Sequence, residues 1–146
     1  MRFTLASILA VAALGAIAPA ANAYIYWTNK ETSKIARAFN DGTEALNAFT
    51  GPATVSSSTN PFGIAVDSNY IYWTSPIGRT INRSNLDGTG VQTLATLTSS
   101  GYGSSPRGIA VDSTHIYWAD NLRQEIGRAN LDGSNVQQPF ISTAPR

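Results

Sequence analysis

Short runs that alternate apolar and polar residues, separated by turns rich in Gly, Asn, Asp and Ser, recur along most of the chain. The run YIYWTN at residues 24–29 returns as YIYWTS at 70–75 and as HIYWAD at 115–120. Alternation with a period of two is typical of half-buried β-strands. The copies repeat at about 45 residues, a period that indicates one supersecondary unit used several times.

Two other segments keep the same register. GIAVD stands at 63–67 and 108–112, and NLDG at 85–88 and 130–133, with a degenerate FNDG at 39–42. Each unit therefore predicts four strands, with the Asp-Gly pair as a hairpin turn and Pro139 on an outer edge strand. Four short strands per repeat predict an all-β fold of the β-propeller type.

The aromatic residues of the second strand are predicted to be core. Side chains alternate along a strand, so Ile and Trp point to one sheet face and Tyr to the other. A blade packs both faces against neighbours, and each large aromatic side chain buries about 150–250 Å². We interpret the whole set as structural, and not as a ligand cage: Tyr26, Trp27, Tyr72, Trp73, Tyr117 and Trp118.

The N-terminus has a different pattern. Met1 and Arg2 precede an apolar run over residues 3–18, and small residues then lead to Ala23. This order predicts a signal peptide over residues 1–23, cleaved after Ala23, and a secreted or periplasmic protein. The run is shorter than the roughly 20 residues of a membrane-spanning helix, so we expect no membrane association after cleavage.

Charge and cysteine content narrow the classes of partner. The chain has 10 Lys and Arg against 9 Asp and Glu, without a basic cluster, so we expect no nucleic-acid partner. It has no cysteine, which excludes disulfides and thiolate zinc sites and suggests a bacterial-style secreted protein.

The segments YWTN, YWTS and YWAD, with their NLDG and GIAVD flanks, resemble the YWTD repeat, the class B repeat of the low-density lipoprotein receptor. The resemblance covers residues 24–146. It implies a six-bladed propeller, mostly used for binding or spacing without catalysis. The acidic residue of the motif remains only as Asp120, since Asn29 and Ser75 replace it elsewhere, so we expect a weaker polar bridge in the first two blades. No cysteine-rich modules flank the array, so a lipoprotein-receptor role is not implied.

The repeat divides the chain into a partial blade at 24–59 and blades at 60–104 and 105–146. The first blade lacks a GIAVD segment, so we expect eleven strands in about three blades, which is an incomplete ring. Three explanations stay open: a fragment of a larger propeller, a homodimer in which two copies complete a six-bladed ring, and an open array.

Candidates for chemistry are few. Catalysis needs converging nucleophile, base or metal ligands, and the chain has one histidine, His115, which we interpret as a packing residue. Asp67 and Asp112 are weak candidates for a calcium site in the central channel, and we favour a turn-capping role for them. We therefore predict no catalytic residue, no cofactor and no enzyme activity. Arginines at one repeat position are expected to tie strands together, and not to form an anion-binding ring: Arg37, Arg83 and Arg128.

Function should depend on what differs between blades. Aromatic and Arg side chains favoured at binding hot spots are predicted on loops at one propeller face: Phe62, Arg79, Tyr102, Arg107 and Arg123. The leading hypothesis is a non-catalytic extracytoplasmic binding or scaffold module with a protein or glycan partner. The alternatives are a gluconolactonase-like, metal-dependent hydrolase and a truncated product without independent function.

Overall fold

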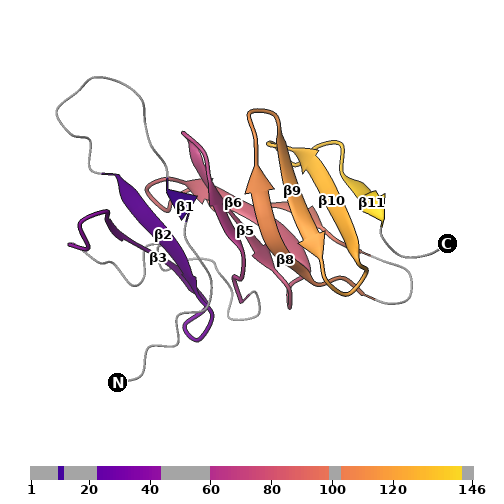
Figure 1. Cartoon of the computed structure of the whole chain (residues 1–146), viewed down its shortest axis with the longest axis horizontal. Coiled ribbons are helices and arrows are strands. Elements are labelled where there is room, and N and C mark those ends of the chain that lie inside the picture. The colour runs from indigo at the N-terminus through magenta and orange to yellow at the C-terminus, as the bar shows by residue number, and fades with distance from the viewer. Residues whose placement is uncertain (1–9, 12–22, 44–59, 99–102, 143–146) are drawn as a thin grey trace.

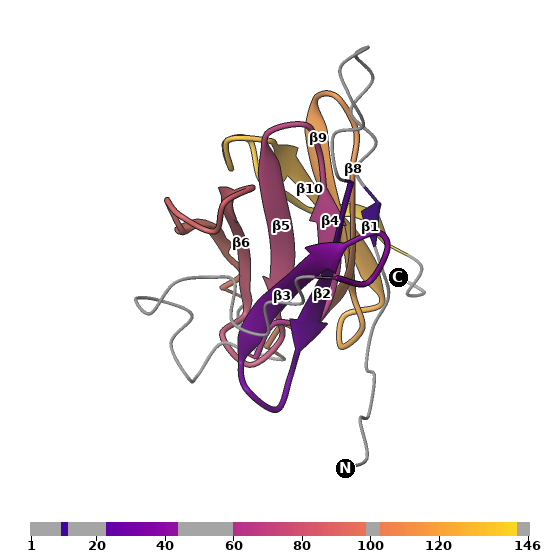
Figure 2. The same ribbon diagram turned by 90° about the vertical axis from the view of Figure 1, so that its left-hand side faces the viewer.

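The fold is an all-β array of three antiparallel sheets (Figure 1). The computed structural model describes residues 10–11, 23–43, 60–98 and 103–142, which contain eleven strands and no helix. Figure 2 shows the first sheet in front of the second, with the third behind. The expected incomplete propeller of about three blades is confirmed.

Each sheet is one blade, with its strands side by side in chain order. Blade 1 comprises β1 (Ala10–Val11), β2 (Tyr24–Asn29) and β3 (Lys34–Phe39). Blade 2 comprises β4 (Ile64–Val66), β5 (Tyr70–Ser75), β6 (Thr80–Asn85) and β7 (Gln92–Thr96). Blade 3 comprises β8 (Pro106–Val111), β9 (His115–Asp120), β10 (Glu125–Asn130) and β11 (Gln137–Ser142). Pro139 lies on the edge strand β11, as its missing N–H requires.

Blade 1 differs from the sequence-based expectation. The sequence predicts no inner strand here, whereas the structure places the backbone of β1 in that position, paired with Ile25 and Tyr26 of β2. β1 lies inside the segment that we predict to be a signal peptide. The expected fourth strand falls at residues 44–59, outside the described residues, so the eleven strands are distributed differently from the prediction.

The core lies between the blades. Tyr26 and Ile35 of blade 1 pack against Ile64, Ile71 and Trp73 of blade 2. A second cluster joins blade 2 to blade 3, with these members: Tyr72, Ile81, Ala95, Leu97, Ile116, Trp118 and Ala129. Ile71 and Trp73 thus face one way and Tyr72 the other, as strand alternation requires. Burying one such side chain contributes about 1.5–3 kcal/mol.

We call the sheet face that points toward the following blade the trailing face, and the opposite one the leading face. Tyr26 and Tyr72 on trailing faces are 2% and 0% exposed, and Trp73 on a leading face is 1% exposed. Tyr117 on the trailing face of blade 3 and Trp27 on the leading face of blade 1 are only half-buried. The two outermost faces of the described array therefore carry the same aromatics with less cover.

A close backbone approach joins blades 2 and 3. A Cβ added to Gly63 would lie 2.1 Å from the carbonyl oxygen of Arg107, so only glycine fits there. Thr74 fixes this approach, because its hydroxyl accepts a hydrogen bond from the Gly63 N–H at 2.9 Å and donates to the Arg107 carbonyl at 2.7 Å.

Replacing Gly63 with Ala should therefore lower the free energy of unfolding by about 1–3 kcal/mol, the usual cost of overpacking. Gly108 is the matched control in blade 3, where the nearest atom to an added Cβ is the Ala119 Cβ at 3.7 Å. Urea unfolding in dilute protein should show Gly108→Ala close to the unchanged chain. Equal losses for the two variants would contradict this account of the blade contact.

Candidate functional site

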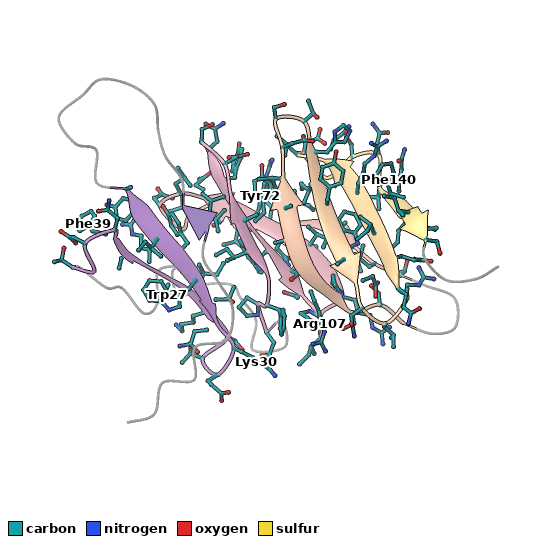
Figure 3. The ribbon with its side chains drawn as sticks, in the orientation of Figure 1. Trp27, Lys30, Phe39, Tyr72, Arg107 and Phe140 are labelled. Carbon is teal, nitrogen blue, oxygen red and sulfur yellow. The ribbon has the colours of Figure 1, made fainter. Side chains whose placement is uncertain are left out.

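The two ends of the sheets differ in charge. In antiparallel blades, the β2–β3, β5–β6 and β9–β10 turns share one end with the segments before β4 and β8. We call this the basic end, because its described residues carry more cations than acids. The acids are Glu31, Asp120 and Glu125, and the cations are Lys30, Lys34, Arg79, Arg107 and Arg123. The opposite, aspartate end carries the remaining turns, with these acids: Asp41, Asp67, Asp87, Asp112 and Asp132. Figure 3 shows Lys30 and Arg107 together at the lower, basic end.

Two of the predicted binding residues meet at the basic end. The Arg107 guanidinium lies 5.1 Å from the centre of the Phe62 ring, a cation–π contact. Arg107 is exposed and Phe62 half-buried, so the pair presents a flat aromatic face with a charge on it.

The other predicted residues divide differently. Arg79 and Leu122 flank Gly103, since a Cβ added to Gly103 would lie 3.5 Å from Arg79 Nη2 and 3.6 Å from Leu122 Cδ2. Arg123 forms an ion pair with Glu125 at 3.6 Å, which satisfies part of its charge. Tyr102 lies outside the described residues. The structure thus gives two groupings, Phe62 with Arg107 and Arg79 with Leu122.

The sequence analysis missed Ile77, which is 63% exposed in the β5–β6 turn, as Leu122 is 54% exposed in the β9–β10 turn. The β2–β3, β5–β6 and β9–β10 turns share one backbone form, because Ser33, Arg79 and Gln124 all adopt a φ of about 55°. The turns can therefore be aligned position by position, and Ile77 and Leu122 occupy the same position of the turn in blades 2 and 3. This alignment of the turns was the signal that could have identified Ile77.

Asp120 is the buried polar centre that holds one of these turns. It is 1% exposed and accepts hydrogen bonds from the backbone N–H groups of Leu122 and Arg123 at 3.1 and 3.2 Å. Further donors are the Ser104 hydroxyl, the Ser105 N–H at 3.0 Å and the Gln138 amide at 2.9 Å. Burial raises the pKa of Asp120, but these hydrogen bonds together hold it below its ordinary value.

Among the described residues, the equivalent position makes fewer hydrogen bonds in the other two blades, in line with the expectation from the sequence. The Asn29 side chain accepts one hydrogen bond, from the Thr32 N–H at 3.2 Å. The Ser75 hydroxyl accepts one from the Asn82 amide at 3.3 Å.

Asp67 and Asp112 are bound into turns at the aspartate end. One oxygen of Asp112 accepts the N–H groups of Thr114 and His115 at 2.7 and 2.8 Å, and the other accepts the Tyr117 hydroxyl at 3.0 Å. Asp67 has the same arrangement, with Tyr72 as the hydroxyl donor at 2.9 Å. Within the described ranges, no three acidic or histidine side chains gather as metal ligands.

The repeated arginines connect blades. Arg37 donates from Nη1 to the Leu86 carbonyl at 3.4 Å, and Arg83 donates from Nη1 to the Leu131 carbonyl at 2.9 Å. These bonds are of the tying kind expected from the sequence, and each carbonyl belongs to the following blade.

An aromatic ring supports each arginine. Arg37 and Arg83 stack on Tyr24 and Tyr70 at 4.4 and 4.2 Å. His115 replaces that tyrosine in blade 3, and there Arg128 stacks on Phe140 at 4.0 Å. Phe140, which sequence analysis did not single out, therefore supplies the missing aromatic support from β11.

Comparisons with known proteins support the fold class. No family model and no curated protein matches the sequence. A chain in the crystal structure of a nidogen/laminin complex is similar, with a TM-score of 0.64 and 29% identity over 78% of this chain and 42% of that one. A catalytically inactive virginiamycin B lyase from Staphylococcus aureus, solved with quinupristin, has a TM-score of 0.61 and 23% identity over 80% of this chain and 37% of that one.

Both neighbours are β-propellers, and the described blades of this chain are those of an incomplete β-propeller. The chain spans about two fifths of the length of either neighbour. Among the described residues, no helix has the length and apolar character needed to cross a membrane.

Acid should destabilise the fold, because turn hydrogen bonds hold the pKa values of four aspartates below their ordinary range: Asp41, Asp87, Asp112 and Asp132. A carboxyl with a depressed folded-state pKa contributes stability above its unfolded value of about 3.9. That contribution is lost as the pH falls from about 5 toward the folded pKa. Unfolding by urea between about pH 6 and pH 2 should show this fall in stability.

Asp112→Asn provides the matched test, because the amide oxygen can still accept the turn hydrogen bonds without a charge that titrates. This variant should lose less stability between about pH 5 and pH 2 than the unchanged chain. An identical dependence in both proteins would show that Asp112 does not contribute.

Proposed function

We propose that the chain is a non-catalytic, extracytoplasmic binding or scaffold module of the YWTD type, and that its partner is an acidic protein or glycan surface bound at the basic end. One observation carries the proposal: exposed arginines lie near half-buried or exposed apolar side chains there, in groupings that differ from blade to blade. Phe62 with Arg107 and Arg79 with Leu122 are those groupings. Residues that every blade shares serve the blade contacts and not this end.

The chemistry of the basic end supports an acidic partner. Arginine guanidinium groups pair with carboxylate or sulfate through two parallel hydrogen bonds. Ile77 and Leu122 supply the apolar area that accompanies such anchors. The similar propeller chain from the nidogen/laminin complex belongs to an assembly of proteins, which supports a protein partner here.

Reversing two charges tests the proposal. Arg79→Glu combined with Arg107→Glu should weaken binding by about ten-fold or more, equivalent to about 1.4 kcal/mol. The probes are a polyglutamate peptide and dextran sulfate, measured by biolayer interferometry at low salt. A preference for one of them would identify the protein or the glycan as the partner class.

The control is Ser68→Glu combined with Ser113→Glu, which adds negative charge at exposed turns of the aspartate end. This variant should bind like the unchanged protein. If neither probe binds, or both double variants lose the same affinity, the basic end is not the binding site.

A metal-dependent hydrolase is the enzymatic alternative, and Asp67 with Asp112 would be its ligands. Their oxygens already accept turn hydrogen bonds, which compete with a cation for the carboxylate lone pairs. Calorimetric titration with Ca²⁺ and Zn²⁺ is therefore expected to show no saturable site. Tight binding that Asp67→Ala plus Asp112→Ala abolishes would favour the hydrolase.

We also propose export and cleavage after Ala23, which gives a secreted or periplasmic protein. Cleavage would remove β1 from the inner edge of blade 1. The intact mass of protein recovered after export should correspond to a chain beginning at Tyr24. A mass that retains residues 1–23 would instead keep β1 in the sheet.

A further inference from the structure

The trailing face of blade 3 carries the apolar part of the contact set that joins the blades elsewhere, whereas Ala119 stands at the position of Thr28 and Thr74. Tyr117 and Ile126 occupy the positions of Tyr72 and Ile81, which are 0% and 1% exposed between blades 2 and 3. Tyr117 and Ile126 are only half-buried. The face is thus built as a blade contact but lacks the cover that the other blade contacts have.

The edge strand β11 extends this apolar face. Phe140 is 38% exposed and lies 6.2 Å from the Tyr117 ring. Ile141 pairs with Ile126, so its side chain shares the same face, and it is 50% exposed. These side chains add exposed apolar area to the side of blade 3 away from blade 2, around Arg128, which stacks on Phe140.

The arginine series identifies the polar part of the contact. Arg37 reaches the Leu86 carbonyl beside Asp87, and Arg83 reaches the Leu131 carbonyl. The hydrogen bonds from Thr89 lower the pKa of Asp87 most, and the charge of Arg37 lowers it further.

The hydrogen bonds from Ser134 lower the pKa of Asp132 most, and the charge of Arg83 lowers it further. Arg128 is the third member of the series. Its Nε donates to Gln137 at 3.1 Å, and the described residues include no following blade for its Nη1.

The leading face of blade 1 carries the complementary half of this contact. Trp27 holds the position of Trp73 and Trp118, which are 1% exposed, but is only half-buried. The turn at Asn40 and Asp41 holds the position of the carbonyl and the aspartate that Arg37 and Arg83 meet in the following blades. In contrast to Asp87, Asp41 has its pKa lowered by Thr43 without a contribution from an arginine.

We propose that the trailing face of blade 3 docks on the leading face of blade 1 of a second copy, so that two copies close head to tail into one six-bladed ring. Arg128 of each copy then donates to the Asn40 carbonyl and faces Asp41 of the other. A second copy is the occupant because it presents the complementary face, and because the contact continues the interface already repeated twice within the chain.

Closure of the ring gives the pair a defined size. Closed propellers have about four to eight blades, and two copies of the three described blades fall within this range. A head-to-tail contact either closes into a ring or grows into a filament. The proposal requires closure at two copies.

Charge swapping tests the contact. Light-scattering mass measured on the full chain expressed in an exporting host should be twice that of one chain at micromolar concentration. Arg128→Asp places two aspartates together and Asp41→Arg places two arginines together, so each variant should be monomeric. The double variant Arg128→Asp with Asp41→Arg restores opposite charges and should recover the dimer.

The matched control is Glu31→Arg, which makes the same acid-to-base change at an exposed turn of blade 1 away from the proposed contact. It should remain dimeric, and circular dichroism should show all the variants folded. A monomeric unchanged chain at high concentration, or species larger than a dimer, would overturn the ring. A double variant that stays monomeric would overturn the pairing of Arg128 with Asp41.

The proposed ring is independent of the proposed binding function, which is tested at the basic end with other residues. If the unchanged protein is a dimer but binds neither probe, only the proposed binding function is overturned. Loss of the dimer with intact probe binding would overturn the ring alone.

Discussion

Every blade of this chain has two apolar faces, and the structure depends on covering both. A β-strand presents alternate side chains to opposite sides, so Ile71 and Trp73 face one neighbour while Tyr72 faces the other. A blade alone would leave both of these sets in water. Stacking is therefore the condition for folding, and stability is approximately the sum of the blades and of the contacts between neighbours.

Polar groups set the register of the stack. Thr28 and Thr74 each donate a hydroxyl to a carbonyl of the following blade, at 2.8 and 2.7 Å. Arg37 and Arg83 reach other carbonyls, and Gly63 allows the backbones to approach. The arginine position is shared by all three blades and the glycine position by blades 2 and 3, whereas Ala119 stands in blade 3 at the position of Thr28 and Thr74. Positions left free for function are those in the turns, where Ile77, Leu122 and the arginines of the basic end lie.

The sequence predicted the blades well because their physics is local and repeated. Alternating apolar residues, Asp-Gly turns and a constant register fix strands such as β5 and β9. The capping role of Asp112 was also predictable, since its partners Thr114 and His115 follow it directly. The identity of what Arg83 meets was not predictable, because Leu131 lies in another blade and only the packed fold brings its carbonyl near.

Other contacts were not predictable because a residue from a different strand takes the place of the usual partner. Phe140 supports Arg128 where His115 interrupts the tyrosine series, and β11 brings it there from outside the motif. The candidate binding residues came from a weaker argument, that aromatic and Arg side chains in variable loops favour binding. The structure places the Arg107 guanidinium over the Phe62 ring and sets Arg79 and Leu122 beside Gly103. Arg123 instead forms an ion pair with Glu125.

Hydrogen exchange followed by mass spectrometry tests most directly whether contacts between blades hold the array together. In dilute, unpaired chains, blade 2 is the blade that the described array covers on both faces, so β5 and β6 should exchange most slowly. Exchange should be faster in β2 and β3 and in β9 and β10, whose outer faces have no neighbouring blade among the described residues. Equal protection of the three blades under these conditions would contradict the account.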